Sequence, residues 1–544
     1  MDRRELLKST LLNCGVALAG GALGSLVPRN VLAAAPTAPI IETNQGKLRG
    51  AFANGAYSFK GIPYGASTGD AMRFQPPLPP KPWIGVRDAL AIGPPAPQAI
   101  LSSNSLEFLG AIVGPGSMAE DCLVLNLWTP ALHTRSKRPV MVWLHGGGCA
   151  IGSSGIAPYD GTNLAARHDV VVVGVNHRLN AFGYLYLGQM GGEKCADSGN
   201  AGMLDIILAL QWVRDNVERF GGDPGNVTIF GESGGGVKVS TLMAMPAAKG
   251  LFHKAIVESG PGLTLYSREE ADLVARKFLD RLHVPPDRVD DLFNIPMDKF
   301  IAGMRSMPFQ EALLSWWPVV DGRSLPRHPF NPDAPAMTAK VPMLIGSTAA
   351  ETTLLYGLDD PASFSLNETD MRTKVKGFLA LKDDSKLDAL ITTYRKNRPD
   401  ATPSDIYFAI TTDGWMRMDA ITQAERKAAQ HAASAYMYIF AWQTPVLGGK
   451  LKASHVMELP FVFDNVAKVP GWIGTGSDLQ PLADKVSSTW AAFARNGNPN
   501  HAGLPHWPPY EASTRATMIF NDDCKVVNDP GKDERLAMGS LSQT

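Results

Sequence analysis

Seven short runs of apolar, mostly β-branched residues constrain the fold of this chain more than any other feature of its sequence. They occupy residues 123–128, 140–144, 170–175, 227–230, 255–257, 341–345 and 436–442. Several are apolar throughout, which is typical of strands covered on both faces. Helical patterns separate them, most clearly over residues 200–220. This alternation predicts an α/β fold with a mostly parallel central sheet covered by helices on both faces.

Three other stretches complete the predicted organisation. Residues 40–52 predict a hairpin that turns at Gln45-Gly46, and the proline-dense residues 76–97 predict a loop. Residues 269–307 and 367–431 are long and mainly helical, so we expect them to be insertions that form a cap. Because there is no internal repeat, low-complexity linker or composition break, residues 34–544 are expected to form one domain.

The N-terminal segment resembles a twin-arginine export signal. Arg3-Arg4 precedes an apolar stretch over residues 11–27, and Val31-Leu32-Ala33 offers small residues for cleavage. A membrane anchor is the alternative, but the stretch is too short and too weakly hydrophobic for one. We therefore expect residues 1–33 to be a removed signal peptide. The mature protein would be periplasmic or secreted in a prokaryote, with no stable membrane anchor.

Charge and cysteine content exclude several classes of partner. The 544-residue chain has a formal net charge of −1, so long-range attraction for nucleic acid is not expected. Its five cysteines show neither CxxC spacing nor a cluster with histidines, a pattern that argues against a zinc site. No metal or organic cofactor is implied, and the expected partner is a small molecule.

A G-x-S-x-G pentapeptide directly follows the apolar run at residues 227–230. It reads Gly231-Glu232-Ser233-Gly234-Gly235 and precedes a predicted helix over residues 237–245. A sharp strand-to-helix turn of this kind exposes a serine hydroxyl above the sheet edge at a helix N-terminus. The alternative, a phosphate-binding loop, requires Gly-Lys-Ser/Thr, whereas residues 236–239 read Gly-Val-Lys-Val. Ser233 is the candidate nucleophile.

A second glycine-rich loop, His145-Gly146-Gly147-Gly148, directly follows the apolar run at residues 140–144. Successive glycines let backbone N–H groups turn toward one point without interference from Cβ atoms. Such a loop holds the negative oxygen of a tetrahedral intermediate in acyl transfer. We expect Gly147, Gly148 and Gly234 to supply the oxyanion-hole donors.

A serine nucleophile needs a base, which in this chain order is a late histidine. His455 follows the predicted strand at residues 436–442 by a loop, as the base should. The other late histidines are expected to be solvated: His431 in a polar helix, and His501 and His506 in a loop.

The acid that orients the base should follow a late strand. Glu351 lies just beyond the apolar run at residues 341–345, where it could accept a hydrogen bond from the imidazole and fix its tautomer. Asp321 is the alternative, but Asp321-Gly322 predicts a turn before that strand, at its wrong end.

These motifs together resemble the type B carboxylesterase family, which includes the cholinesterases. The resemblance extends over most of the chain after about Pro39, through ordered matches at residues 120–126, 176–179, 199–205, 220–224, 230–235 and 318–322. It implies an α/β-hydrolase fold, a Ser233/Glu351/His455 triad and an oxyanion hole of Gly147, Gly148 and Gly234.

Three positions depart from the family pattern. Gly234 stands where the family usually has Ala, and Cys149 stands where an aromatic residue often follows the glycine triplet. The usual disulfide partner of Cys122 is absent, since residues 93–98 read Gly-Pro-Pro-Ala-Pro-Gln. Cys122 is therefore predicted to be a free, buried thiol.

The sequence leaves two possible roles open for each of three side chains near the motifs. Glu232 is either structural or a charge at the pocket edge. Trp316 and Trp317 either line an acyl pocket or belong to the core, which is the commoner place for such aromatics.

The predicted function is that of a serine carboxylic-ester hydrolase that works through an acyl-enzyme. Two alternatives stay open: the same chemistry on lipid, thioester, polyester or amide substrates, and a non-catalytic binding protein of the same fold.

Overall fold

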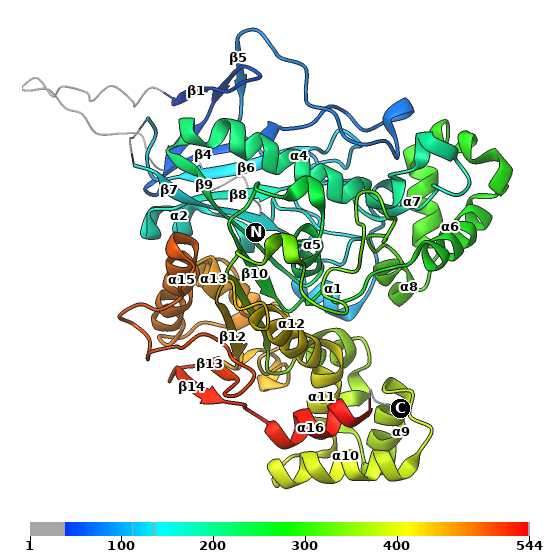
Figure 1. Cartoon of the computed structure of the whole chain (residues 1–544), viewed down its shortest axis with the longest axis vertical. Helices are drawn as coiled ribbons and strands as arrows, with labels where there is room; N and C mark the ends of the chain where they lie inside the picture. Colours follow the sequence, from blue (N-terminus) through cyan, green and yellow to red (C-terminus); the bar gives the residue numbers. More distant parts are fainter. Residues whose placement is uncertain (1–37, 111, 134–135, 542–544) are drawn as a thin grey trace, which may run out of the picture. The chain divides into compact units, whose positions relative to one another are not determined.

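The computed structural model describes residues 38–110, 112–133 and 136–541, and the predicted signal peptide at residues 1–33 lies outside them. The apolar runs form the middle of an eleven-stranded sheet (Figure 1). In spatial order its strands are β14 (Lys525–Asn528), β13 (Ala516–Phe520), β12 (Ala435–Phe440), β11 (Met343–Thr348), β10 (Lys254–Glu258), β9 (Gly222–Glu232), β7 (Arg138–Leu144), β8 (Val171–Val175), β6 (Val124–Thr129), β4 (Ala56–Pro63) and β3 (Ala51–Ala53). The strands from β8 to β13 pair in parallel, while both ends of the sheet are antiparallel.

Each central strand contributes side chains to two separate hydrophobic cores, one on each face of the sheet. In β7, Val140, Val142 and Leu144 belong to one core, and Met141 and Trp143 belong to the other. The first core is closed by α4 (Ala201–Asn216), α5 (Gly234–Leu242) and α12 (Met418–Ala428). The second is closed by α2 (Thr162–His168), α13 (Leu459–Val462) and α15 (Leu479–Asn496). The predicted fold class is thus confirmed, because both faces of the parallel strands are covered.

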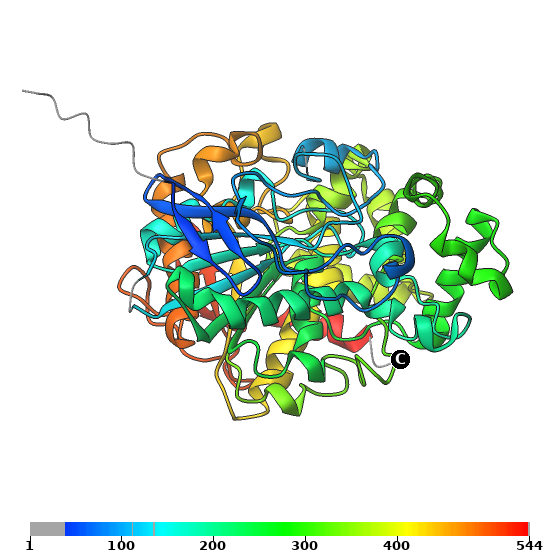
Figure 2. The same cartoon turned by 90° about the horizontal axis from the view of Figure 1, so that it is seen from above.

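A small three-stranded sheet comes first along the described chain. The predicted hairpin is formed by β1 (Ile40–Glu42) and β2 (Lys47–Arg49). The proline-dense segment, predicted to be loop alone, also contains β5 (Val86–Asp88), which pairs in parallel with β2. Prolines surround these three residues but none occupies them, so their backbone is free to pair. Figure 2 shows this small sheet in dark blue, on the opposite side of the view from the green helices of the first insertion.

The two insertions are helical, as predicted. The first contains α6 (Arg268–Leu282) and α7 (Met297–Arg305), and α8 (Phe309–Leu314) follows just beyond its predicted end at residue 307. The second contains α9 (Glu368–Phe378), α10 (Asp384–Asn397) and α11 (Pro403–Thr412) before α12. A reciprocal capping box starts both α6, at Ser267 with Glu270, and α11, at Thr402 with Asp405. In Figure 1, α9, α10 and α11 gather beside α16 (Lys532–Leu541). The remaining α-helices are short: α1 (Asn104–Leu109), α3 (Asn180–Tyr184) and α14 (Pro470–Ile473).

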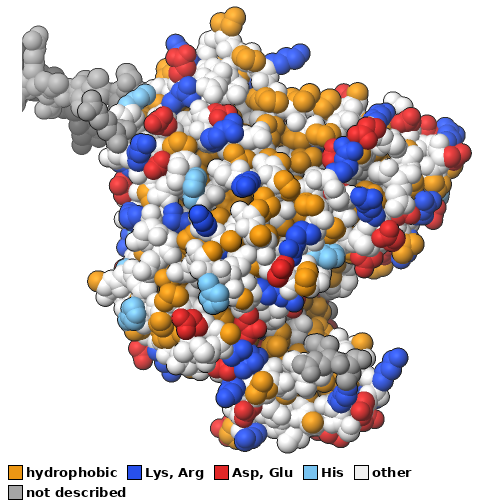
Figure 3. Space-filling model, viewed as in Figure 1, with side chains coloured by type: hydrophobic (Ala, Val, Ile, Leu, Met, Phe, Trp, Pro, Cys, Tyr) orange, Lys and Arg blue, Asp and Glu red, His pale blue; other side chains and the backbone are white. Residues whose placement is uncertain are grey.

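Charged side chains of both signs intermingle over the face seen in Figure 3. Among the residues that the structure describes, no helix is both long and apolar enough to cross a lipid bilayer.

Candidate active site

Ser233 lies at the sharp turn between β9 and α5, with a φ of 56° and a ψ of −124°. Positive φ is costly for a side-chain-bearing residue, so neighbouring structure must hold the turn. One such restraint is the Ser233 N–H, which donates to the Glu258 carbonyl oxygen at 2.8 Å. The next residue must be glycine, because a Cβ on Gly234 would overlap the backbone of Gly148. The hydroxyl-bearing residue is therefore fixed at the end of a buried strand.

The predicted oxyanion loop passes directly beside this turn. Gly147 and Gly148 have φ values of 84° and 62°, which favour glycine. A Cβ on Gly148 would also lie 2.8 Å from the Leu313 carbonyl oxygen. Gly148 lines one pocket with Gly147 and Ser233, and a second pocket with Ser233 and Gly234. The structure thus brings the three predicted donor residues to the serine.

His455 and Glu351 are in direct contact. The imidazole Nδ1 lies 2.6 Å from Glu351 Oε2, and both side chains are almost completely buried. The other carboxylate oxygen, Oε1, accepts hydrogen bonds from the Thr348 N–H at 2.7 Å and from the Ser259 hydroxyl at 2.7 Å. Three donors therefore fix this carboxylate when Nδ1 carries a proton, which directs the lone pair of Nε2 toward the pocket.

The alternative candidates lie elsewhere. Asp321 organises a turn by accepting from the backbone N–H groups of Arg323 and Leu325 at 2.8 and 2.9 Å. His501 contacts the Lys485 carbonyl oxygen and the Thr489 hydroxyl, while His431 and His506 are exposed.

The Nε2 atom of His455 has no hydrogen-bond partner among the described residues, so Ser233 and His455 are not hydrogen-bonded here. Its nearest carboxyl oxygen is Glu232 Oε1, at 3.1 Å. The ring of Trp415 packs against the imidazole, with centroids 5.2 Å apart. Glu232 is almost fully buried and also lines the pocket, so it lies at the pocket wall as a buried side chain.

Four buried glutamates, Glu232, Glu258, Glu351 and Glu458, lie close enough to repel one another. Two of them, Glu351 and Glu232, contact the imidazole. Burial, followed by repulsion from Glu458 and Glu351, raises the pKa of Glu232 well above its ordinary value. Burial and then the Glu351 charge do the same to the pKa of Glu458, and burial raises the pKa of Glu258 to about 8. Neutral carboxyls at these three positions relieve the repulsion that four buried charges would create.

Sequence reasoning did not find Ser259, Glu258 or Glu458. A signal was available for each of them. Glu258-Ser259 closes the apolar run at residues 255–257, at the same edge of the sheet as Ser233, and Glu458 follows His455 by three positions. Polar residues at the carboxyl ends of neighbouring parallel strands meet at one place.

Two inner pockets meet at Ser233. Both contain Gly148, Ser233, Leu313 and Leu355. The first also contains Leu106, Leu109, Ile112, Ile156, Tyr159, His455 and Trp472, and the second also contains Phe309, Trp317, Tyr356, Trp415 and Met416. Trp317 therefore lines a pocket, whereas Trp316 is a core residue whose ring meets Phe278 edge-on with centroids 5.2 Å apart.

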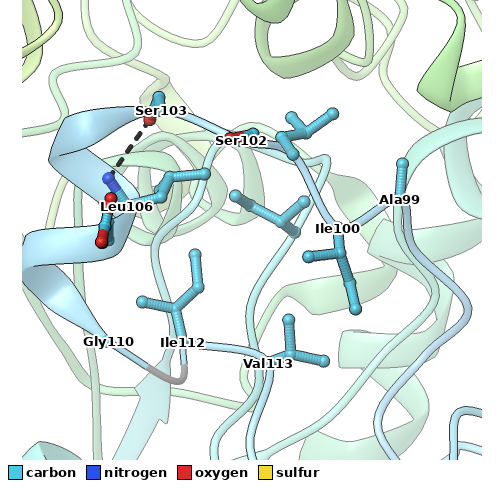
Figure 4. A pocket seen from close by; sticks show the side chains of 11 residues that line it. Ala99, Ile100, Ser102, Ser103, Leu106, Gly110, Ile112 and Val113 are labelled. Atoms are coloured by element: carbon cyan, nitrogen blue, oxygen red, sulfur yellow. Dashed lines mark hydrogen bonds between the residues drawn. The ribbon is translucent and has the colours of Figure 1, made fainter.

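Each inner pocket continues into a larger outer space. The first shares Leu106, Ile112 and Ile151 with an outer groove of about 450 Å³. Figure 4 shows apolar side chains around this groove, with the Ser103 hydroxyl accepting from the Leu106 N–H at 3.2 Å. The second shares Val237, Trp317, Trp415 and Met416 with an outer cavity of about 400 Å³.

The described cysteines are Cys122, Cys149, Cys195 and Cys524, and all are free and buried. The prediction of a free Cys122 is confirmed. The described residues include no group of three or more His, Cys, Asp or Glu side chains arranged to hold a metal ion.

Comparisons with known proteins agree with this geometry. Residues 37–538 match the model of the carboxylesterase family. A para-nitrobenzyl esterase of Bacillus subtilis is 34% identical over 508 residues, 92% of this chain and 98% of that protein. A solved carboxylesterase of Geobacillus stearothermophilus is 36% identical, with a TM-score of 0.80 over 92% of this chain and 99% of that one. An esterase of Clostridium hathewayi, described as able to hydrolyse aliphatic aromatic polyesters, is 32% identical, with a TM-score of 0.75 over 93% of this chain and 98% of that one.

Proposed function

Since the chain belongs to the carboxylesterase family of ester hydrolases, we propose that it cleaves carboxylic esters through an acyl-enzyme carried on Ser233. His455 is the base, Glu351 orients the base, and the N–H groups of Gly147, Gly148 and Gly234 hold the oxyanion.

The reaction runs in two halves. The Ser233 oxygen forms a bond to the ester carbonyl carbon while its proton passes to His455 Nε2, and the carbonyl oxygen becomes an oxyanion held by the three N–H groups. The intermediate collapses, the bond to the alcohol oxygen breaks, and His455 protonates the leaving alcohol. Water then attacks the acyl-enzyme with His455 as base, which frees the acid and restores the serine.

The contact between His455 and Glu351 carries this proposal. Its short Nδ1 to Oε2 distance of 2.6 Å and the two further donors to Oε1 are what an orienting carboxylate needs. The Nε2 atom makes no hydrogen bond among the described residues, although Glu232 Oε1 lies 3.1 Å away, and His455 lines the same pocket as Ser233. Hydrogen bonds between base and nucleophile are often loose before substrate binds, so substrate binding is expected to complete this one.

The test is hydrolysis of p-nitrophenyl esters of increasing acyl length by the wild type and by Ser233→Ala. We expect turnover by the wild type and loss of it in the variant. Equal activity of the two proteins would refute the role of Ser233. Inactivity of both on every ester would count against ester hydrolysis.

A second substrate class is favoured by the two outer spaces. An ester inside a long apolar chain has apolar groups on both sides, and each of the two inner pockets that meet at Ser233 continues into an outer space of its own. We therefore propose aliphatic–aromatic polyesters as substrates as well, by analogy with the printed activity of the Clostridium hathewayi relative.

This second proposal has its own variant. Ile100 lines the outer groove and is 64% exposed, so Ile100→Asp should slow release of fragments from soluble oligoesters while leaving p-nitrophenyl butyrate hydrolysis unchanged. Leu273→Asp on α6, a residue of 61% exposure, is the matched control. Equal rates on oligoesters for both variants would count against an extended chain in this groove.

We also propose that the protein reaches the periplasm or the medium by the twin-arginine route, with cleavage after Ala33. The support is the Arg3-Arg4 pair with its apolar stretch. Replacing both arginines with lysine should leave full-length, active protein in the cytoplasm. Unchanged export of the double variant would refute this route.

A further inference from the structure

A lysine that the mechanism does not use lies beneath the predicted oxyanion loop. Lys238 is on α5, five positions after Ser233, and its side chain is completely buried. Among the described residues, no Asp or Glu oxygen lies within 4.0 Å of its ammonium. A buried ammonium without a counter-ion must find other acceptors, so its hydrogen bonds show what it holds.

The ammonium of Lys238 bonds the loop at two places. Its Nζ donates to the carbonyl oxygen of His145 at 3.0 Å and to that of Gly148 at 3.0 Å. These carbonyls belong to the peptide units 145–146 and 148–149. The N–H groups of Gly147 and Gly148 belong to the units 146–147 and 147–148, which lie between them. Because each peptide unit is planar, the lysine fixes the unit on either side of the two that carry donors.

A second observation concerns how closely the loop approaches α5. A Cβ on Gly234 would overlap the backbone atoms of Gly148, its carbonyl oxygen first. The glycine that replaces the usual alanine therefore admits the loop to a position that Lys238 then holds. Gly147 and Gly148 both have positive φ, and a glycine loop of this kind has little conformational restraint of its own.

We propose that Lys238 is a positioning residue that holds the oxyanion loop in its active geometry from below. This rests on the proposed function, since it concerns the donors of the same reaction. The lysine acts through the loop backbone and does not touch substrate. Replacing Lys238 keeps the N–H groups of Gly147 and Gly148 but no longer fixes their orientation toward the oxyanion. A displacement of about 1 Å at a reacting centre costs about 100-fold in rate.

The test compares Lys238→Met with a matched control, Lys427→Met. Lys427 is also completely buried, and its Nζ also bonds two backbone carbonyl oxygens, those of Thr338 at 3.0 Å and Ala339 at 2.7 Å, in a different part of the fold. It bonds the Gln430 side-chain oxygen at 2.9 Å as well. Both substitutions remove a buried ammonium and leave two carbonyls without it, so both should lower the Tm. We expect only Lys238→Met to lower kcat on p-nitrophenyl butyrate, by about 10- to 100-fold, with KM within about threefold of the wild type.

A pair of inhibitors separates oxyanion binding from pocket binding. An alkyl trifluoromethyl ketone accepts the Ser233 oxygen at its carbonyl carbon. The serine proton passes to His455, and the carbonyl oxygen becomes an oxyanion in the hole. The methyl ketone of equal chain length occupies the pocket without stable addition. We expect Lys238→Met to lower the affinity for the trifluoromethyl ketone by the same factor as it lowers kcat, and to leave the affinity for the methyl ketone unchanged.

Three results would overturn the proposal. They are a kcat for Lys238→Met equal to that of Lys427→Met, an equal loss of affinity for both ketones, or failure of Lys238→Met and of the donor-retaining Lys238→Gln to fold while Lys427→Met folds. Failure of the proposed function is separate, because it would appear as an inactive wild type or an active Ser233→Ala protein.

Discussion

Replacing Glu351 with glutamine should disable the base by reversing its tautomer. The site of Oε1 receives two donors, the Thr348 N–H and the Ser259 hydroxyl, each at 2.7 Å. A backbone N–H can only donate, so the amide oxygen of the glutamine must take this site. Its NH₂ group then faces His455 Nδ1, which lies 2.6 Å from Oε2 in the wild type. Nδ1 becomes an acceptor, and the proton moves to Nε2.

A base whose Nε2 already carries a proton cannot take one from Ser233. Loss of the correct tautomer in a comparable triad costs about 10⁴-fold in kcat, or about 5 kcal/mol of transition-state stabilisation. We expect a loss of that order for Glu351→Gln in steady-state hydrolysis of p-nitrophenyl butyrate. Nitrogen-15 NMR of labelled histidine should show the change of tautomer at His455.

Glu458→Gln is the control for this prediction. Glu458 is as fully buried as Glu351, and burial, followed by the Glu351 charge, raises its pKa well above the ordinary value. The amide then replaces a neutral carboxyl, so kcat should stay within about threefold of the wild type. A Glu351→Gln protein that keeps more than about a tenth of the wild-type kcat would refute the tautomer argument.

Two further predictions concern stability. Arg178→Met should lower the free energy of unfolding by about 3–5 kcal/mol, because it leaves the buried Asp205 carboxylate without the guanidinium that lies 2.6 Å away. Urea denaturation measures the free energy of unfolding. Adding Asp205→Asn to Arg178→Met should recover part of the lost stability, whereas a loss below about 1 kcal/mol for Arg178→Met would contradict the reasoning. Glu258 has a folded-state pKa of about 8, above its ordinary value of 4.5. The contribution of this pKa difference to the stability of the folded protein is therefore fully present below about pH 4.5 and is lost as the pH rises through about 8. Glu258→Gln, which keeps an acceptor for the Trp490 indole N–H, should therefore gain stability relative to the wild type by a few kcal/mol between pH 5 and pH 9, and parallel pH profiles of the two proteins would contradict this.

The sequence predicted the buried parts of the fold well because burial leaves a direct signal. Strands covered on both faces are mostly apolar, and every residue of β7, β8 and β10 is buried, with charged side chains only at strand ends (Arg138, Lys254 and Glu258). Element ends were harder to predict where that signal is absent. β9 begins at Gly222 rather than at residue 227, because Gly222 already pairs with Arg138 of β7 while residues 222–226 carry no apolar pattern that would predict a strand.

The start of α5 shows a second limit. The predicted helix begins at residue 237, whereas α5 begins at Gly234. Three successive glycines have poor helix propensity, so the sequence pattern excluded them. In the folded protein, side chains at these positions would collide with the loop and with neighbouring backbone, and that tertiary requirement overrides propensity.

Sequence motifs and chain order predicted the candidate catalytic residues, but they did not predict the residues that hold those residues in position. Ser233, Glu351 and His455 each follow a recognisable strand. Ser259 reaches Glu351 across 92 positions of the chain, and the Lys238 ammonium reaches back 93 positions to the His145 carbonyl. Such contacts depend on how strands are ordered in the sheet, which a single sequence does not encode in any local pattern.

That strand order also sets when the enzyme can become active as it folds. Ser233, Glu351 and His455 follow β9, β11 and β12, and β10 must lie between the first two strands before the site exists. Parallel neighbours require long crossovers, and His455 meets Glu351 across 104 positions, so these pairings are non-local and slow to form. Secondary structure should therefore recover early during refolding from denaturant, whereas hydrolytic activity should return only with the last of these pairings.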